Sequence, residues 1–214
     1  MRDAPLPHAV LFDLLTALLD SWSLWDSVAG STQRGRAWRS RYLQLTYGCG
    51  EYAPYERLVA DAAAETGLPA GAAGRLVERW SELAPWSEVA ETLGRLAGRT
   101  RLGVVTNCSR ALGHAAALRV PEIAWDCVVT AEDAGAYKPD PRPYRQALVQ
   151  LGVTAGEAVF VAGSGYDLVG TATVGLRTYW HNRAGLPRPP GAPAAAIESP
   201  TLDALPAWLA ALAR

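Results

Sequence analysis

The feature of this sequence that most constrains its fold is a set of short apolar runs separated by segments long enough for a helix. Four runs have the character of buried strands: His8 to Phe12, Leu102 to Thr106, Cys127 to Thr130 and Ala158 to Ala162. A fifth candidate strand is Thr178 to Trp180. Strands that alternate with helices are typical of parallel βαβ units. The sequence therefore predicts an α/β protein with a doubly wound, Rossmann-like parallel sheet.

The stretch between the first two runs is much longer than one crossover helix requires. It contains five segments with apolar residues at helical spacing, namely Ser21 to Ala29, Gly35 to Thr46, Pro54 to Thr66, Gly71 to Leu83 and Glu88 to Leu96. The last of them suffices as the crossover helix of the sheet. We therefore predict a helical cap domain, residues 17–86, inserted into an α/β core domain formed by residues 1–16 and 87–214.

The C-terminal part is predicted to complete the core without adding a domain. After Arg183 the chain is rich in Pro, Gly and Ala, a composition that cannot hold a long helix. We expect a loop there, followed by a closing helix from Thr201 to Leu212.

Charge and cysteine content indicate the kind of ligand and the compartment. The chain carries 20 Lys and Arg against 21 Asp and Glu, so it lacks the basic surface that binds nucleic acid or an anionic membrane. Its three cysteines have no C-x-x-C spacing, which argues against a disulfide framework and a structural zinc site. The N-terminus has no apolar signal segment. We expect a cytoplasmic protein that binds a small molecule and has no nucleic-acid or membrane partner.

Polar residues occur where the predicted strands end. Asp13 follows the first run, Thr106 and Asn107 end the second, Lys138 comes after the third and Asp167 after the fourth. Ligands of open parallel sheets bind outside the carboxyl ends of the strands. Taken singly, such residues are more often helix caps, turn residues or solvated charges. Their occurrence on successive strand ends favours one active site that contains all of them.

At these positions the sequence resembles the haloacid dehalogenase superfamily, whose four motifs match in order between Phe12 and Gly175. The inserted helices lie where that superfamily carries its helical cap. The closest resemblance is to the 2-haloacid dehalogenase branch. "AWRSRYLQLTY" is similar to the cap segment with the halide-binding arginine, which falls on Arg39. "YKPDPRPY" is similar to the third motif, with Lys138 and Tyr144 at ligand-contacting positions.

The resemblance implies a hydrolase that displaces halide from a small 2-haloalkanoic acid through an aspartyl ester. Asp13 would be the nucleophile, and the charge of Lys138 would keep it ionised. Thr106 and the backbone N–H groups of Leu14 and Leu15 would bind the substrate carboxylate. No cofactor is implied for such a displacement.

The resemblance also assigns the leaving group and the second chemical step. Arg39 and Asn107 would stabilise the departing halide as its charge develops. The fourth motif, with Asp167 and Ser164, would position and activate the water that hydrolyses the ester.

Three positions depart from the pattern of the branch. Ala17 stands where a threonine is expected, although the neighbouring Thr16 could replace it through a shifted backbone. Ala162 stands where the branch has a serine, and Ser164 where it has an asparagine. These changes remove side-chain donors and bear on the hydrolysis of the ester more than on its formation. His181 is expected to be a packed residue near a strand end and not a base.

Two other functions stay open. Most members of the superfamily are magnesium phosphohydrolases, so a phosphatase that binds Mg²⁺ through Asp13 and Asp167 is the nearest alternative. Leu15 and Gly163 argue against it, because such phosphatases carry acidic residues at both positions. The other alternative is a non-catalytic protein that uses the crevice for binding only. The resemblance also allows a homodimer, because related cap-bearing enzymes are often dimers.

Overall fold

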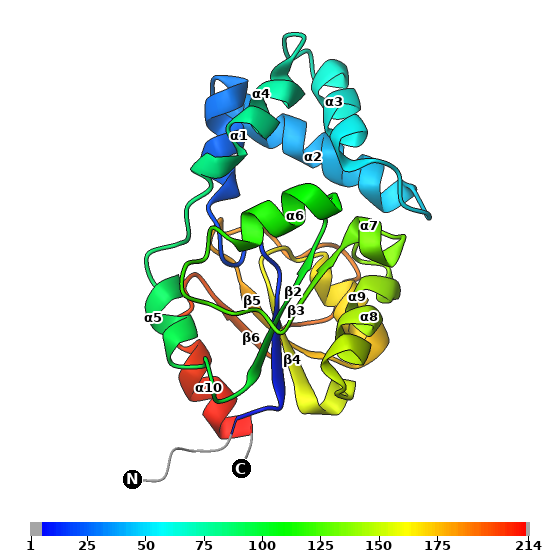
Figure 1. Cartoon of the computed structure of the whole chain (residues 1–214). Helices are drawn as coiled ribbons and strands as arrows, with labels where there is room; N and C mark the ends of the chain where they lie inside the picture. The colour runs from blue at the N-terminus through cyan, green and yellow to red at the C-terminus, as the bar shows by residue number, and fades with distance from the viewer. Residues whose placement is uncertain (1–5, 213–214) are drawn as a thin grey trace.

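The computed structural model describes residues 6–212 and has a parallel sheet at its centre (Figure 1). Its six strands are β1 (Ala9–Phe12), β2 (Arg101–Thr106), β3 (Cys127–Thr130), β4 (Ala158–Ala162), β5 (Arg177–His181) and β6 (Ile197–Ser199). Their order in the sheet is β3-β2-β1-β4-β5-β6, and all neighbours are parallel. The predicted doubly wound α/β fold is confirmed.

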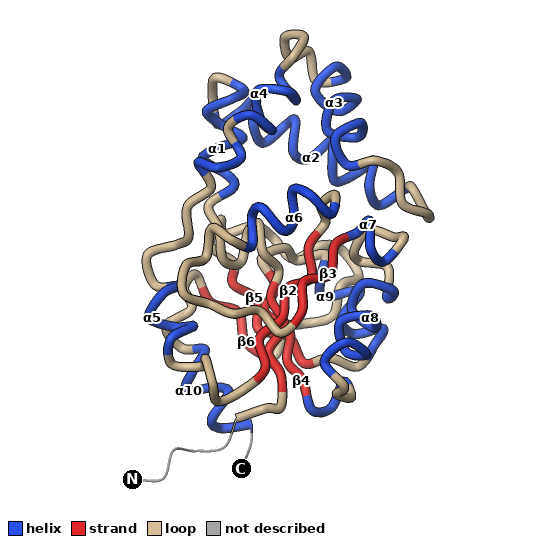
Figure 2. Tube along the Cα trace, viewed as in Figure 1, coloured by secondary structure: helices blue, strands red, loops and turns tan. Residues whose placement is uncertain are grey.

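Helices cover both faces of this sheet, as Figure 2 shows. The helices of the core are α5 (Val89–Gly94), α6 (Arg110–Ala117), α7 (Ala131–Ala134), α8 (Pro141–Leu151), η2 (Ala155–Glu157), α9 (Asp167–Val174) and α10 (Leu205–Leu212). In β1, Val10 and Phe12 pack with α5, α6 and α10, whereas Ala9 and Leu11 pack with α8 and α9. A strand buried on both faces needs a continuous apolar run. None of the helices described is both long and apolar enough to cross a bilayer.

A layer of helices between β1 and β2 lies above the carboxyl ends of the strands, and we call it the cap (Figure 1). It consists of α1 (Ser21–Ala29), α2 (Thr32–Gly48), α3 (Tyr55–Glu65), α4 (Ala72–Glu78) and η1 (Trp80–Glu82). Its interior is aromatic, with the rings of Trp25 and Trp38 4.5 Å apart. The indole N–H of Trp38 donates to the Val59 carbonyl at 2.8 Å and ties α2 to α3. The domain boundaries at residues 17 and 86 stay a prediction.

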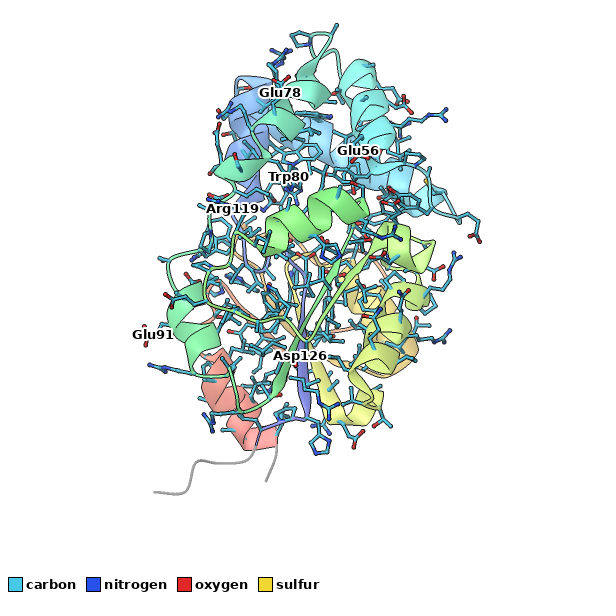
Figure 3. All side chains as sticks on the ribbon, in the orientation of Figure 1. Glu56, Glu78, Trp80, Glu91, Arg119 and Asp126 are labelled. Carbon is cyan, nitrogen blue, oxygen red and sulfur yellow. The ribbon has the colours of Figure 1, made fainter. Side chains whose placement is uncertain are left out.

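The two chain segments that connect cap and core pair with each other. Leu19 and Pro85 form an isolated antiparallel bridge there. The cap also rests on α6, where the indole N–H of Trp80 donates to the Leu112 carbonyl at 2.9 Å. The guanidinium of Arg119, just beyond α6, donates to a carbonyl at the end of the cap at 3.1 Å. Figure 3 labels Trp80 and Arg119, which lie where the two layers meet.

The C-terminal part differs from the sequence prediction. The sequence predicts only a loop before the closing helix, whereas the structure has a sixth strand at Ile197–Ser199. This strand has three residues, none of them buried, and follows a proline-rich stretch, so no apolar run marks it. The closing helix begins at Leu205 instead of Thr201. In the cap, the segment predicted as one helix from Gly71 to Leu83 is divided into α4 and η1.

Gly103 in β2 leaves no room for a side chain, so Gly103→Ala is expected to destabilise the core. An added Cβ would lie 2.6 Å from Sγ of Cys127 and 2.7 Å from Cδ2 of Leu11. Overpacking of this kind costs about 1–3 kcal/mol, and urea unfolding measures it. The matched control is Gly94→Ala in α5, where nothing lies within 4 Å and alanine is the better helix former. An unchanged free energy of unfolding for Gly103→Ala would contradict this account of the sheet.

Candidate active site

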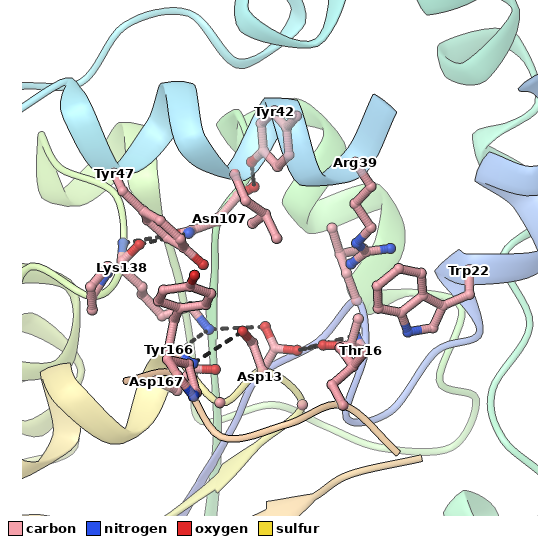
Figure 4. Close-up of a pocket in the computed structure, with 18 of the residues that line it drawn as sticks. Asp13, Thr16, Trp22, Arg39, Tyr42, Tyr47, Asn107, Lys138, Tyr166 and Asp167 are labelled. Carbon is pink, nitrogen blue, oxygen red and sulfur yellow. Dashed lines mark hydrogen bonds and ion pairs between the residues drawn. The ribbon is translucent and has the colours of Figure 1, made fainter. Parts of the chain in front are cut away.

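The carboxyl ends of the strands and the lower side of the cap enclose a pocket (Figure 4). Its polar lining residues are Asp13, Thr16, Arg39, Asn107, Lys138, Ser164 and Asp167. Its aromatic lining residues are Trp22, Trp25, Tyr42, Tyr47, Tyr55 and Tyr166. Figure 4 shows Asp13, Lys138 and Asp167 together on the core side, with Arg39 and Tyr47 extending from α2 of the cap.

Three buried charges form the centre of the pocket. Nζ of Lys138 lies 2.9 Å from Oδ1 of Asp13 and 3.1 Å from Oδ1 of Asp167. The three residues are between 3% and 7% exposed. Lys138 is the only lysine of the sequence, and all the other residues in the count of 20 Lys and Arg are arginines. Since buried charges are tolerated only when they are paired, these contacts fix all three side chains.

The surroundings shift the pKa values of Asp13 and Asp167 in opposite directions. Burial acts to raise the pKa of Asp13, but the charge of Lys138 and hydrogen bonds from Thr16 and Lys138 outweigh it, and the pKa lies below its ordinary value. For Asp167, burial outweighs the charge of Lys138, and with the nearby Asp13 it raises the pKa. Burial acts to lower the pKa of Lys138, but both carboxylates raise it overall. The pocket therefore holds one firmly ionised carboxylate beside a more basic one.

The turn after β1 holds the second oxygen of Asp13. Oδ2 accepts hydrogen bonds from Oγ1 of Thr16 at 2.6 Å, from its backbone N–H at 3.1 Å and from the N–H of Ala17 at 3.2 Å. Thr16 thus supplies the hydroxyl that is missing at Ala17. A Cβ at Gly163 would overlap the Thr16 hydroxyl and the Ala17 nitrogen. The loop after β4 can approach this turn only because residue 163 is a glycine.

The same turn also has donors without an acceptor among the described residues. Among the described residues, no acceptor is found for the backbone N–H groups of Leu14 and Leu15. Leu15 lines the pocket, whereas the side chain of Leu14 is fully buried in the core. Two adjacent free N–H groups beside Asp13 suit an oxygen ligand such as a carboxylate.

Arg39 brings a second positive charge to the pocket from α2. It is 8% exposed, and its guanidinium lies 4.2 Å from the ring centre of Trp22. Nη1 donates to Oγ of Ser21 at 2.7 Å. Within residues 6–212 no carboxylate lies at ion-pair distance from it. Burial lowers the pKa of Arg39, but a guanidinium remains charged. A buried cation without an anion makes this part of the pocket suited to an anionic ligand.

Two residues predicted to contact the substrate, Tyr144 and Thr106, are fully buried in the structure. Tyr144 is fully buried behind Asp167, and its hydroxyl donates to Oδ1 of that residue at 2.7 Å. Thr106 is also fully buried, and its hydroxyl lies 3.9 Å from Sγ of Cys108. Neither residue belongs to the described wall of the pocket. In the structure the Tyr144 hydroxyl orients Asp167 and the Thr106 hydroxyl lies beside Cys108, while direct contact of either residue with substrate stays a prediction.

Asn107 and Ser164 line the pocket, and their predicted contact with substrate stays a prediction. The side chain of Asn107 donates to the Lys138 carbonyl at 3.0 Å and accepts from the Lys138 N–H at 2.7 Å, so it also fixes the backbone of that residue. Oγ of Ser164 accepts from the N–H of Tyr166 at 3.3 Å. His181 is fully buried and its ring nitrogens face the carbonyls of Ala17 and Pro200, as expected of a packed residue.

The aromatic wall was missing from the predicted site. Tyr47 of the cap and Tyr166 of the core lie with their rings 4.5 Å apart and close one side of the pocket. On α2, Arg39, Leu43 and Tyr47 are four residues apart and all line the pocket. That spacing on one helix face is the signal from which Tyr47 could have been included. The position of Trp22 under the Arg39 guanidinium has no comparable signal in the sequence.

The residues present do not fit a magnesium ion. Mg²⁺ requires several oxygen ligands in octahedral geometry. Here the ammonium of Lys138 lies against Oδ1 of both Asp13 and Asp167, and Oδ2 of Asp13 already accepts three hydrogen bonds. No group of three His, Cys, Asp or Glu side chains within residues 6–212 could hold a metal ion.

Replacement of Lys138 by methionine should leave two adjacent buried carboxyl groups without a cation. We expect Lys138→Met to lose about 3–5 kcal/mol of unfolding free energy near neutral pH. The loss should shrink as the pH falls, because the folded variant then binds a proton at a raised pKa. In the wild type the lowered pKa of Asp13 contributes stabilisation that is present above pH 3.8 and is lost as the pH falls below it, whereas the raised pKa of Asp167 contributes the opposite trend.

Urea unfolding at several pH values measures both trends. Arg95→Met, which removes an exposed cation paired with Glu91, is the control and should change the free energy of unfolding little. An equal loss for Lys138→Met at every pH would show that the ammonium does not compensate the two carboxylates.

Comparisons with known proteins agree with this geometry. A family model described as haloacid dehalogenase-like hydrolase matches residues 15–175. The (S)-2-haloacid dehalogenase 4A of Burkholderia cepacia is 30% identical over 197 residues, which are 84% of this chain and 85% of the relative. The haloacetate dehalogenase H-2 of a Moraxella species is 27% identical over 194 residues, 83% of this chain and 87% of the relative.

A solved structure of a dehalogenase superposes with a TM-score of 0.82 at 29% sequence identity, covering 95% of this chain and 97% of that one. The four strand-end positions, the inserted cap and the family match thus point to the same conclusion. The chain belongs to the haloacid dehalogenase-like hydrolases, in the branch of the 2-haloacid dehalogenases.

Proposed function

We propose that this protein is a 2-haloacid dehalogenase that removes the halogen of a small 2-haloalkanoic acid. The observation that carries the proposal is the pairing of an ionised, buried Asp13 with Lys138 on one side of the pocket and an anion-free, buried Arg39 on the other. The names of two relatives, a (S)-2-haloacid dehalogenase and a haloacetate dehalogenase, agree with it.

In the first step, a carboxylate oxygen of Asp13 attacks the carbon that bears the halogen. A carbon–oxygen bond forms as the carbon–halogen bond breaks, and the halide leaves with the bonding electrons. Lys138 keeps Asp13 ionised, and Arg39 stabilises the charge that develops on the halide. A halide needs no proton on departure, which fits the absence of an acid at Leu15.

In the second step, water attacks the carbonyl carbon of the aspartyl ester. Asp167 takes a proton from this water, a role that its raised pKa favours. The hydroxyl of Tyr144 and the ammonium of Lys138 both contact Oδ1 of Asp167 and hold it in place. The ester C–O bond then breaks, and Asp167 returns its proton to the departing alkoxide oxygen, so the product leaves as a 2-hydroxy acid. The second proton of the water leaves the Asp13 carboxyl for solvent, which regenerates the carboxylate.

The substrate carboxylate would bind at the free N–H groups of Leu14 and Leu15, near the positive charge of Lys138. The remainder of the pocket wall is largely aromatic, which suits a short apolar chain on the substrate. We also propose that the reaction needs no cofactor, that the protein acts in the cytoplasm, and that it forms a homodimer.

No observation favours the two alternatives. A phosphatase of this fold needs an acid to protonate its leaving alkoxide, and Leu15 offers none. An acid at residue 163 cannot be accommodated, because any side chain there would overlap Thr16. A protein that only binds its ligand would gain nothing from a buried nucleophile and lysine, whose desolvation is costly.

Asp13→Asn should abolish halide release from 2-chloro- and 2-bromoalkanoic acids. An amide is a much weaker nucleophile than a carboxylate, so kcat should fall by at least about 1,000-fold. Halide release is measured with purified protein in EDTA. Asp20→Asn is the matched control, because Asp20 caps α1 and asparagine caps equally well. Full activity of Asp13→Asn, or a wild type that releases no halide from any of these acids, would refute the proposed function.

The pH dependence should separate the two steps. As the pH falls, Asp167 takes up a proton before Asp13, because the pKa of Asp167 is raised and that of Asp13 is lowered. Alkylation of Asp13 then continues while ester hydrolysis loses its base. The fraction of enzyme present as ester, measured by mass spectrometry after acid quenching, should therefore rise toward low pH. A fraction that does not change while turnover slows would exclude Asp167 as the base.

A further inference from the structure

Ser21 connects the cap arginine to the turn that carries the nucleophile. It is the first residue of α1 and is fully buried. Its hydroxyl oxygen accepts a hydrogen bond from Nη1 of Arg39 at 2.7 Å, and its proton is donated to the backbone carbonyl of Leu15. One hydroxyl thus joins α1, α2 and the turn after β1.

The carbonyl that Ser21 contacts belongs to the peptide group that holds Asp13. The C=O of Leu15 and the N–H of Thr16 are two ends of the same planar unit. That N–H donates to Oδ2 of Asp13 at 3.1 Å. A peptide group whose carbonyl accepts a hydrogen bond is polarised, which makes its N–H a better donor. The orientation and the donor strength of this peptide therefore depend on Ser21.

The contacts form a continuous chain of hydrogen bonds. It runs from the Arg39 guanidinium through the Ser21 hydroxyl and the peptide between Leu15 and Thr16 to the carboxylate of Asp13. We infer that Ser21 is a positioning residue that couples the anion site at Arg39 to the nucleophile Asp13. The inference rests on the proposed function and extends it to a residue that does not touch the reacting atoms.

The hydroxyl of Ser21 is not needed to cap the helix. Asp20 is the N-cap residue of α1, and its carboxylate accepts from the N–H and the hydroxyl of Ser23. Ser21 instead directs its hydroxyl into the space between the cap and the core. Because Nη1 of Arg39 is bound by Ser21 and one face of the guanidinium lies on Trp22, the remaining N–H groups have a fixed direction.

The chain has a consequence for the reaction. A halide bound at Arg39 accepts from the same guanidinium that donates to the Ser21 hydroxyl, and Arg39 in turn depends on Ser21 to stay in place. Loss of the Ser21 hydroxyl should therefore weaken halide binding and also slow the attack of Asp13. A residue with only a packing role would change stability without changing both of these quantities.

The test compares Ser21→Ala with Ser21→Cys and with Ser23→Ala. Ser21→Ala removes both hydrogen bonds, and Ser21→Cys fills the same space with a weak donor and acceptor. Ser23→Ala removes an exposed hydroxyl from the same helix and is the matched control. Bromide affinity is measured by quenching of tryptophan fluorescence, since Trp22 lies against Arg39. Values of kcat for a 2-bromo acid and melting temperatures are measured on the same proteins.

We expect Ser21→Ala to weaken bromide binding and to lower kcat by about tenfold each, in keeping with the loss of a hydrogen bond to a charged group. Ser21→Cys should lose part of both, so the test holds even if the alanine variant folds poorly. Ser23→Ala should stay within about twofold of the wild type in both quantities, because substitutions at exposed sites usually have small effects.

Three results would overturn the inference: unchanged bromide affinity and kcat in both Ser21 variants, an equal loss in Ser23→Ala, or a wild type that does not bind bromide. If bromide binds to the wild type and its affinity depends on Ser21, but no halide is released from any 2-halo acid, the dehalogenase function is refuted instead. In that case the coupling of Ser21 to the anion site would stand.

Discussion

The ion pairs of Lys138 with two carboxylates are the constraint on which the active site depends. At this depth a lone ammonium or carboxylate would be driven toward its neutral form. Together, the three groups keep Asp13 ionised and leave Asp167 the more basic of the two. The surrounding contacts serve this arrangement, because Asn107 fixes the backbone of Lys138 and Tyr144 fixes Asp167. A single cation thus gives the two carboxylates different proton affinities, as the proposed roles of nucleophile and base require.

The cap makes this arrangement selective. It excludes solvent from the charges, so that each electrostatic contact is stronger than it would be in water. It also contributes Arg39, the one pocket cation that has no carboxylate partner among the described residues. The aromatic interior of the cap supports the helix that carries this arginine, and Ser21 joins it to the core. The proposed halide site at Arg39 and the proposed nucleophile Asp13 thus lie in one hydrogen-bonded structure.

Ala17 and Gly163, which differ from the pattern of the branch and from that of the phosphatases respectively, have local physical explanations. The hydroxyl missing at Ala17 is supplied by Thr16, whose side chain and N–H both reach Oδ2 of Asp13. Gly163 is required because the loop after β4 passes directly against Thr16 and Ala17. The same close approach removes the place where a phosphatase of this fold carries an acid. For Ala162 the structure offers no substitute donor that we can name.

The sequence by itself determined the parallel sheet, the inserted cap and the residues at the strand ends. Apolar runs, helical spacing and the order of Asp13, Lys138 and Asp167 are local patterns, and parallel strands necessarily bring such ends to one edge. Tertiary structure alone decided which side chains face the pocket. Thr106 and Tyr144 are fully buried outside the described wall of the pocket, whereas Trp22 reaches it from the cap. It also decided that Ser21 meets Arg39. These outcomes depend on how the cap packs against the core. A local sequence pattern does not encode contacts between segments that are far apart in the sequence.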